Sequence, residues 1–206
     1  LEHAIGRGVL EALGIGMSLN PRNVAIRGNF CTIDPSTGAI TDRRAGRIPT
    51  SECARLVEKL SAIRKIEDVD IIIRPVKDYR FALVLEGDGL DDKPTETDPQ
   101  KVGLKTLPVK ALEEASAKSA RILNAWIEKA FALLKEEPQA NACTLRGIAK
   151  DPGLPSYAEV YGLKSCAIAT YPMYKGLARL VQMEVLEGCD TIEDEVAMLK
   201  ANWANF

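Results

Sequence analysis

Apolar and polar residues follow patterns that predict hairpins and helices in the first part of the chain. The alternation over residues 23–34 and the short run 39–42, separated by the turn sequence DPSTG, predicts a β-hairpin. The earlier stretch 8–13 is followed by a glycine and predicts a short helix. After Pro49, apolar residues recur at helical spacing and predict a second helix: Cys53, Leu56, Val57, Leu60 and Ile63.

The middle of the chain predicts a second hairpin and one long helix. Two apolar runs, 69–76 and 80–87, are joined by a short polar link, which is typical of a hairpin. Residues 88–109 are rich in Asp, Thr, Pro and Gly and predict a long loop. Residues 112–134 place their apolar side chains on one broad helical face. A further strand is expected over 141–149, where the apolar run ends near a glycine.

The last third of the chain alternates helices and strands. A short helix is expected over 156–162 and a strand, buried on both faces, over 164–170. The next helix, 171–183, has a proline in its first turn, where a missing N–H does no harm. A strand over 184–188 and a closing helix, 191–203, complete the pattern, and the closing helix starts with a capping-box sequence.

These patterns predict an α/β protein with two kinds of organisation. Residues 18–147 combine hairpins and helices and are typical of an α+β unit. Residues 148–206 follow a βαβα order, which is typical of a parallel sheet. Two or three parallel strands do not normally form an open sheet alone, because both faces and both edges need cover. We therefore expect the βαβα part to be incomplete.

Composition narrows the class of protein. The 206 residues are 46% hydrophobic and 27% charged, as in ordinary globular proteins. The net charge of −2, from 27 basic and 29 acidic side chains, argues against a nucleic-acid partner. No apolar run approaches the ~20 residues that cross a bilayer, so we expect no membrane partner. Nothing in the sequence indicates an oligomeric state.

The cysteines and the N-terminus bear on location. Five scattered cysteines, without a C-x-x-C pair, are typical of small buried side chains in a reducing compartment. The N-terminus carries no signal-peptide pattern. We expect a cytoplasmic protein.

Candidate metal ligands are few. His3 is the only histidine, which excludes a multi-histidine metal site and a central Ser-His-Asp triad within this chain. Four acidic residues of the loop 88–109 could line a hard-cation site or, as their spacing favours, cap turns: Asp88, Asp91, Asp92 and Asp98.

Basic residues gather near the ends of predicted strands. The stretch TDRRAGR (41–47) holds three arginines, and strand alternation places Arg27 and Asn29 on one face. Guanidinium groups bind phosphate and carboxylate oxygens through two parallel hydrogen bonds. Each arginine alone could be a solvated side chain, but together they favour an anion site: Arg27, Arg43, Arg44, Arg47, Arg80 and Arg146, with Lys150 beside them.

Lys175 is a separate candidate. It lies in the first turn of the predicted helix 171–183, just after an apolar strand. Anions are favoured at helix N-termini and beyond the carboxyl ends of parallel strands. An exposed helical lysine is the alternative, and the sequence leaves both open.

Several motifs, in this order, match one known family. They are GRGVLEALGIG (6–16), RGNFCTID (27–34), DRRAGRI (42–48), VLEGDGLDD (84–92), TDP (97–99), LRGIAK (145–150) and YGLKSCAIATYPMYKGLARLVQM (161–183). Together they cover nearly the whole chain and make it resemble the archaeal-type, cofactor-independent phosphoglycerate mutases, of the alkaline-phosphatase-like superfamily.

The resemblance implies a function. Enzymes of this family interconvert 3-phosphoglycerate and 2-phosphoglycerate in glycolysis and gluconeogenesis through a phosphoserine intermediate. Two divalent metal ions, manganese or similar, support the transfer, and no 2,3-bisphosphoglycerate is needed. The ligand would be a small phosphorylated carboxylate. The substrate-binding residues implied by the resemblance are Arg43, Arg44, Arg47, Arg80, Arg146, Lys150 and Lys175, with Arg27 and Asn29 as weaker candidates.

The resemblance also implies that the chain is a fragment. The family's nucleophilic serine precedes the first matched motif, and its main metal-binding Asp/His cluster follows the last. We therefore expect neither catalytic nor metal-binding residues here. Residues 18–147 would be the inserted substrate-binding domain, and residues 1–17 and 148–206 would be parts of the phosphatase-like domain. A related homoserine kinase and a non-catalytic anion-binding module remain alternatives.

Overall fold

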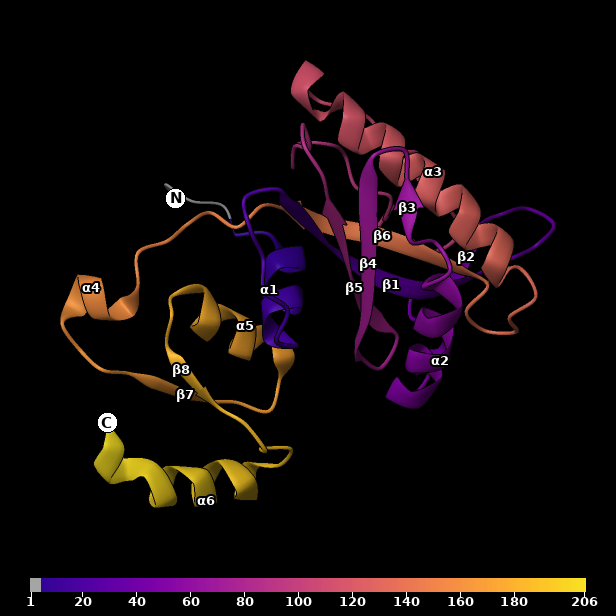
Figure 1. The fold of residues 1–206 in the computed structure, drawn as a ribbon. Helices are drawn as coiled ribbons and strands as arrows, with labels where there is room; N and C mark the ends of the chain where they lie inside the picture. The colour runs from indigo at the N-terminus through magenta and orange to yellow at the C-terminus, as the bar shows by residue number, and fades with distance from the viewer. Residues whose placement is uncertain (1–4) are drawn as a thin grey trace.

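A computed structural model describes residues 5–206, and His3 therefore lies outside the described residues. One six-stranded antiparallel sheet dominates it (Figure 1). Its strands run in the order β2-β1-β5-β4-β3, and β6 pairs with β1. Their bounds are β1 (Asn23–Ile33), β2 (Ile40–Asp42), β3 (Lys65–Ile66), β4 (Val69–Lys77), β5 (Arg80–Glu86) and β6 (Ala142–Ala149). Both predicted hairpins, β1–β2 and β4–β5, are confirmed.

Helices cover the two faces of this sheet differently (Figure 1). Two helices, α2 (Thr50–Leu60) and α3 (Ala117–Leu134), pack on one face over the larger apolar core. Three rings fill the centre of that core, with centroid distances of 4.9 Å for Phe30–Phe81 and 6.0 Å for Phe81–Trp126. Such ring pairs contribute about 0.5–1.5 kcal/mol each beyond the area that they bury.

The opposite face, called the α1 face below, is covered by the single helix α1 (Arg7–Gly14). Its apolar residues meet a small cluster of alanines and valines on the sheet, which includes Ala25 and Val84. The other side of α1 packs against α5 (Pro172–Leu180). Gly176 permits this contact, because a Cβ there would lie 1.9 Å from the Leu10 carbonyl oxygen. Helix α1 thus joins the sheet to the last third of the chain.

The last third forms a second, smaller sheet. Strands β7 (Cys166–Ile168) and β8 (Glu184–Leu186) pair in parallel around α5, which confirms the predicted strand–helix–strand order. The other elements here are α4 (Tyr157–Tyr161) and α6 (Ile192–Asn202), and each begins with a capping box. In Figure 1, α6 lies beyond β7 and β8, at the end of the molecule far from the large sheet.

One predicted helix start and one predicted burial are wrong, and one strand was missed. The long helix begins at Ala117 rather than Leu112, because Ser116 bonds the backbone of Glu113 and turns the chain there. Strand β3 was not predicted, since a strand of two residues is too short to show the alternation of apolar and polar residues. The burial expected for β7 is also wrong: its three residues are only half-buried, since within the described chain this sheet has just two short strands.

The described protein is a mixed α/β structure with a mainly antiparallel sheet. Four cysteines are buried as expected, at positions 31, 53, 143 and 189, and Cys166 is half-buried. Within residues 5–206, no helix is both long and apolar enough to cross a bilayer. The domain boundaries after residues 17 and 147 stay a prediction.

Candidate anion-binding site

Polar side chains gather on the α1 face, beyond the apolar contacts of α1. In the antiparallel register, Arg27 lies opposite Arg146 of β6, and Asn29 lies opposite Arg80 of β5. Residues directly opposite each other in a sheet share a face. The alternation that placed Arg27 and Asn29 together is therefore confirmed, and the sheet adds two of the other predicted arginines to the same face.

A buried aspartate links two arginines from distant parts of the chain. Arg43 follows β2, and its Nη2 donates to Asp98 Oδ2 at 2.8 Å. Arg146 Nη1 reaches the same oxygen at 3.5 Å. The Asp98 side chain is 2% exposed, so it is held away from water between the two guanidinium groups. Oxygen Oδ1 of Asp98 accepts the backbone N–H of Gln100, which fixes the carboxylate.

A buried glutamate faces Arg27 from α1. Glu11 Oε1 lies 3.5 Å from Arg27 Nε, and the Glu11 side chain is 1% exposed. Burial raises the pKa of the Glu11 carboxyl above its ordinary value, and the charges of Arg27, Arg80 and Arg7 partly offset that rise. Burial likewise lowers the pKa of Arg27, against the opposing charge of Glu11.

Arg80 is held on every side. Its Nε donates to the carbonyl oxygen of Lys77 at 3.2 Å, and its Nη2 donates to Asp78 Oδ2 at 3.1 Å. Its Nη1 donates to the hydroxyl of Tyr171 at the start of α5. The guanidinium group also lies over the rings of Tyr79 and Tyr171. The three guanidinium nitrogens are thus engaged by the protein itself.

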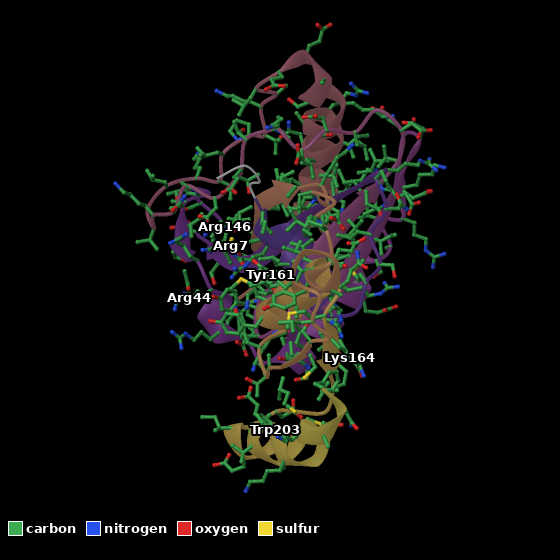
Figure 2. The ribbon with its side chains drawn as sticks, turned by 90° about the vertical axis from the view of Figure 1, so that its left-hand side faces the viewer. Arg7, Arg44, Arg146, Tyr161, Lys164 and Trp203 are labelled. Atoms are coloured by element: carbon green, nitrogen blue, oxygen red, sulfur yellow. The ribbon has the colours of Figure 1, made fainter. Side chains whose placement is uncertain are left out.

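The arginine cluster comprises the five arginines whose guanidinium groups surround Glu11 and Asp98. Arg7, at the start of α1, completes it, and its backbone lies against Gly147 of β6. Figure 2 views the molecule from the side of α1 and α5 and shows Arg7 and Arg146 on that side. The members are Arg7, Arg27, Arg43, Arg80 and Arg146.

The other arginines of TDRRAGR stand apart from the cluster. Arg44 and Arg47 are exposed, whereas Arg43 is half-buried. The loop that carries them is shaped by Asp42, whose carboxylate accepts the N–H groups of Arg44 and Gly46, each at 2.7 Å. Asp42 thus organises the backbone of this turn and leaves the two exposed guanidinium groups available on the surface.

The two predicted lysines lie in different places. Lys150 follows β6, and its N–H donates to Asp92 Oδ2 at 3.0 Å. Lys175 is in the first turn of α5, where its Nζ pairs with Glu187 Oε2 at 2.7 Å. Arg179 pairs with the same carboxylate, and the three charges line a cleft of about 440 Å³. The hydrogen bond from Lys175 contributes most to lowering the pKa of Glu187. None of the cluster arginines lines this cleft.

Comparison with known proteins decides the family. The family model of 2,3-bisphosphoglycerate-independent phosphoglycerate mutase matches residues 1–140. The chain belongs to this family. A relative from Thermus thermophilus, named as a probable 2,3-bisphosphoglycerate-independent phosphoglycerate mutase, is 49% identical over 99% of this chain and 51% of its own length. One of the same name from Thermotoga neapolitana is 47% identical over 100% and 51%. The chain therefore spans about half the length of the curated relatives it matches.

Solved structures agree with the family assignment. A cofactor-independent phosphoglycerate mutase from Thermoplasma acidophilum superposes with a TM-score of 0.69 at 30% identity, over 89% of this chain and 52% of the other. A protein of Pyrococcus horikoshii gives a TM-score of 0.62 at 21% identity, over 88% and 42%, and shows likeness of fold alone.

The acidic loop of this mutase-family chain serves its own structure. Asp91 and Asp92 accept backbone N–H groups, and Asp88 pairs with Arg22 at 2.8 Å. The favoured interpretation, that these residues cap turns, is confirmed for Asp91 and Asp98, which accept from the residue two positions on, but not for Asp88 and Asp92. Residues 5–206 contain no group of three or more His, Cys, Asp or Glu that could hold a metal ion. The residues described here therefore do not fit the metal pair that the family resemblance implies.

Sequence reasoning missed three members of the site. Arg7 and Glu11 are one helical turn apart on α1, and nothing in their spacing points to the sheet beneath. Asp98 lies 55 residues from Arg43 and 48 from Arg146, so only the fold brings them together. The unusual feature that sequence could have offered is Glu11 itself, an acid on the otherwise apolar face of a short helix.

Proposed function

We propose that the protein to which this chain belongs interconverts 3-phosphoglycerate and 2-phosphoglycerate through a phosphoserine intermediate, and that this chain binds the substrate. The observation that carries the proposal is the arginine cluster. Four of its five guanidinium groups pair with three carboxylates, those of Glu11, Asp78 and Asp98, and Arg7 adds a fifth positive charge near Glu11, which leaves two positive charges in excess. A small ligand with a phosphate and a carboxylate complements that excess.

The hydrogen bonds of the cluster leave donors for a ligand. Arg27 donates through Nε, and its two terminal nitrogens take no part in the hydrogen bonds found within residues 5–206. Arg43 and Arg146 each use one terminal nitrogen for Asp98 in the same part of the chain, which leaves the other. Guanidinium forks with free N–H groups suit planar carboxylate and tetrahedral phosphate oxygens.

Binding and orientation are the roles that we assign to this chain. During phosphoryl transfer through an enzyme-bound intermediate, the glycerate must stay bound and turn relative to the nucleophile. Charge-assisted hydrogen bonds hold such a ligand while developing charge is stabilised. Arg44, Arg47 and Lys150 would act at the edges of the site, where they are exposed or half-buried, and Lys175 would act from the separate cleft that it lines. Asn29 would orient Arg27, whose Nε donates to its side-chain oxygen at 3.3 Å.

Other parts of the longer protein would supply the nucleophile and the metal ions. Divalent ions, manganese or similar, would stabilise the charge of the transferred group when bound. Since residues 5–206 form no metal site, we route no step through them. The family description supports a mechanism without 2,3-bisphosphoglycerate. A cytoplasmic location fits a glycolytic substrate.

The arrangement of the last third supports an incomplete phosphatase-like domain. We infer that residues 18–147 are inserted into this domain and that residues 1–17 and 148–206 belong to it. Within the described chain, β7 and β8 pair only with each other. The apolar residues of α6 and the following turn are exposed, with Ile192 at 73% and Trp203 at 74%. Figure 2 shows Trp203 at the end of the molecule. Parallel strands and apolar helix faces of this kind need cover.

An assay of the full-length protein tests the proposed function. Formation of 2-phosphoglycerate from 3-phosphoglycerate is followed without added 2,3-bisphosphoglycerate, and phosphorylation of homoserine by ATP is the counter-assay. We expect turnover in the first assay alone. Phosphorylation of homoserine without mutase turnover would contradict the proposal and favour the kinase alternative.

A further inference from the structure

Two residues of like charge lie opposite each other within the arginine cluster. Arg27 and Arg146 are directly opposite each other on β1 and β6. Their side chains are only 11% and 21% exposed, so water screens them weakly. Like charges directly opposite each other in a sheet destabilise it. The fold must therefore place negative charge near each of these two arginines.

Glu11 supplies a negative charge on the Arg27 side. Its two oxygens have no hydrogen-bond partner among residues 5–206, although Oε1 lies 3.5 Å from Arg27 Nε. Helix α1 packs closely on β1, because a Cβ at Gly8 would lie 2.2 Å from the Ala25 carbonyl oxygen. The carboxylate is thus fixed beside Arg27 by the packing of the helix that carries it.

Asp98 supplies the second negative charge, on the Arg146 side. Its Oδ2 accepts from Arg43 and Arg146 together, and its Oδ1 is held by the N–H of Gln100. The preceding residue, Thr97, makes two hydrogen bonds with Leu145, next to Arg146. The N–H of Thr97 donates to the Leu145 carbonyl oxygen, and the N–H of Leu145 donates to the Thr97 hydroxyl. The loop that carries Asp98 is therefore fastened to β6.

We propose that Glu11 and Asp98 are positioning residues, two fixed internal carboxylates that hold Arg27, Arg43 and Arg146 so that their unused N–H groups face one bound anion. This inference rests on the proposed function, because the anion is the phosphate or carboxylate of the substrate. The carboxylates themselves do not contact the ligand. Each sets the direction of a guanidinium fork that would otherwise turn away from its neighbour.

A positioning role for Asp98 and simple electrostatic attraction of the ligand predict different effects of Asp98→Asn. Replacing Asp98 by asparagine keeps the shape of the side chain and removes a negative charge that competes with the ligand. Anion binding should then be retained or strengthened, because the anion meets more positive charge. The rate of the bound complex should fall, because the forks are no longer held in the reacting geometry. If Asp98 had only a structural role, its substitution would change the amount of folded protein, and it would not lower the rate while leaving anion binding intact.

The experiment uses the full-length protein with Asp98→Asn, Glu11→Gln and the matched control Asp88→Asn. Asp88 lies in the same loop and pairs with Arg22, but both side chains are exposed, at 82% and 57%. The turnover number and KM for 3-phosphoglycerate are measured per folded molecule, with folding checked by circular dichroism. Binding of inorganic phosphate is measured by calorimetry. Asp98→Glu, which keeps the charge, is included to test partial recovery.

We expect kcat to fall at least about tenfold in Asp98→Asn and Glu11→Gln, the size of one lost orienting contact. KM and the Kd for phosphate should stay the same or decrease, Asp98→Glu should recover part of kcat, and Asp88→Asn should match the parent protein. An unchanged kcat, or a raised KM with kcat unchanged, would overturn the inference. If the parent protein has no mutase turnover, the proposed function fails instead, and phosphate binding alone decides: weaker binding in Asp98→Asn overturns the positioning role, and equal or tighter binding supports it.

Discussion

Arg80 on β5 donates a hydrogen bond to the hydroxyl of Tyr171, and its guanidinium carbon lies 5.1 Å from the centre of the Tyr171 ring. Ninety-one residues separate the two in sequence. Tyr171 directly precedes α5, which carries Lys175 in its first turn. This contact therefore connects the arginine cluster on the large sheet to α5, the helix that carries Lys175 and Arg179 at the cleft.

Tyr171→Phe tests that contact. The substitution keeps the ring under the guanidinium group and removes the hydroxyl acceptor from a largely buried arginine. We expect the free energy of unfolding to fall by about 1.5–3 kcal/mol, the range for hydrogen bonds to charged groups. Chemical denaturation of the full-length protein measures the change. Tyr174→Phe is the control, because Tyr174 is 61% exposed and its ring lies beside the Tyr171 ring; equal stability of the two variants would refute the role of the hydroxyl.

Arg44→Ala and Arg47→Ala test the exposed part of TDRRAGR. Both side chains are exposed, so stability should move by less than about 1 kcal/mol. If each donates a charge-assisted hydrogen bond to the substrate, kcat/KM for 3-phosphoglycerate should fall roughly tenfold to hundredfold. Substitution by lysine should recover only part, because the bidentate fork is lost. Steady-state kinetics that match those of the parent protein would make these two arginines surface residues and leave Arg43 as the functional part of the motif.

Sequence patterns predicted the hairpins and their faces because strand alternation is a local property. In RGNF, the residues at 27 and 29 turn to the α1 face, and Gly28 and Phe30 turn to the apolar core. The ring of Phe81 covers Gly28, so that a Cβ there would lie 2.0 Å from it. The motif thus reflects a strand with one polar and one apolar face, which the sequence alone could show.

The partners of the arginines could not be predicted, because each lies far away in sequence. Asp98 comes from a loop whose acidic residues were expected to cap turns, and only the fold brings it to Arg43 and Arg146. The start of the long helix was misplaced for a local reason. Ser116 bonds the backbone of Glu113, and this capping outweighed the apolar pattern that extended back to Leu112.

The pH dependence of stability should reveal the buried Glu11. Burial raises the pKa of its carboxyl in the folded protein above the ordinary value of 4.5, while the unfolded chain keeps the ordinary value. As the pH rises above 4.5, the unfolded state loses this proton first, so the contribution of Glu11 to the free energy of unfolding falls until the raised pKa is passed. Relative to Glu11→Gln, the parent protein should be more stable at pH 4 than at pH 7. Urea unfolding of both proteins at the two pH values measures the difference in free energy of unfolding between parent and variant. The same difference at pH 4 and pH 7 would show that the carboxyl titrates normally.

The 206-residue chain alone should not interconvert the phosphoglycerates, with or without manganese. By resemblance to the family, the nucleophilic serine and the metal ligands lie in other segments of the longer protein. A coupled assay with purified chain and 3-phosphoglycerate measures this directly. Detectable formation of 2-phosphoglycerate would mean that the chain contains a catalytic group that we have not assigned.

The central claim is that the arginine cluster binds the substrate, and Arg146→Ala in the full-length protein tests it most directly. Arg146 is half-buried, bonds Asp98 and lies opposite Arg27 in the sheet, whereas the control Arg121 lies on α3 and pairs with Glu67 at the surface. We predict that Arg146→Ala lowers kcat/KM for 3-phosphoglycerate by roughly tenfold to hundredfold, the loss of a hydrogen bond to a charged group. Arg121→Ala should leave kcat/KM unchanged, because a surface ion pair contributes about 0–1 kcal/mol and only to stability. Equal kcat/KM in the two folded variants would contradict the claim.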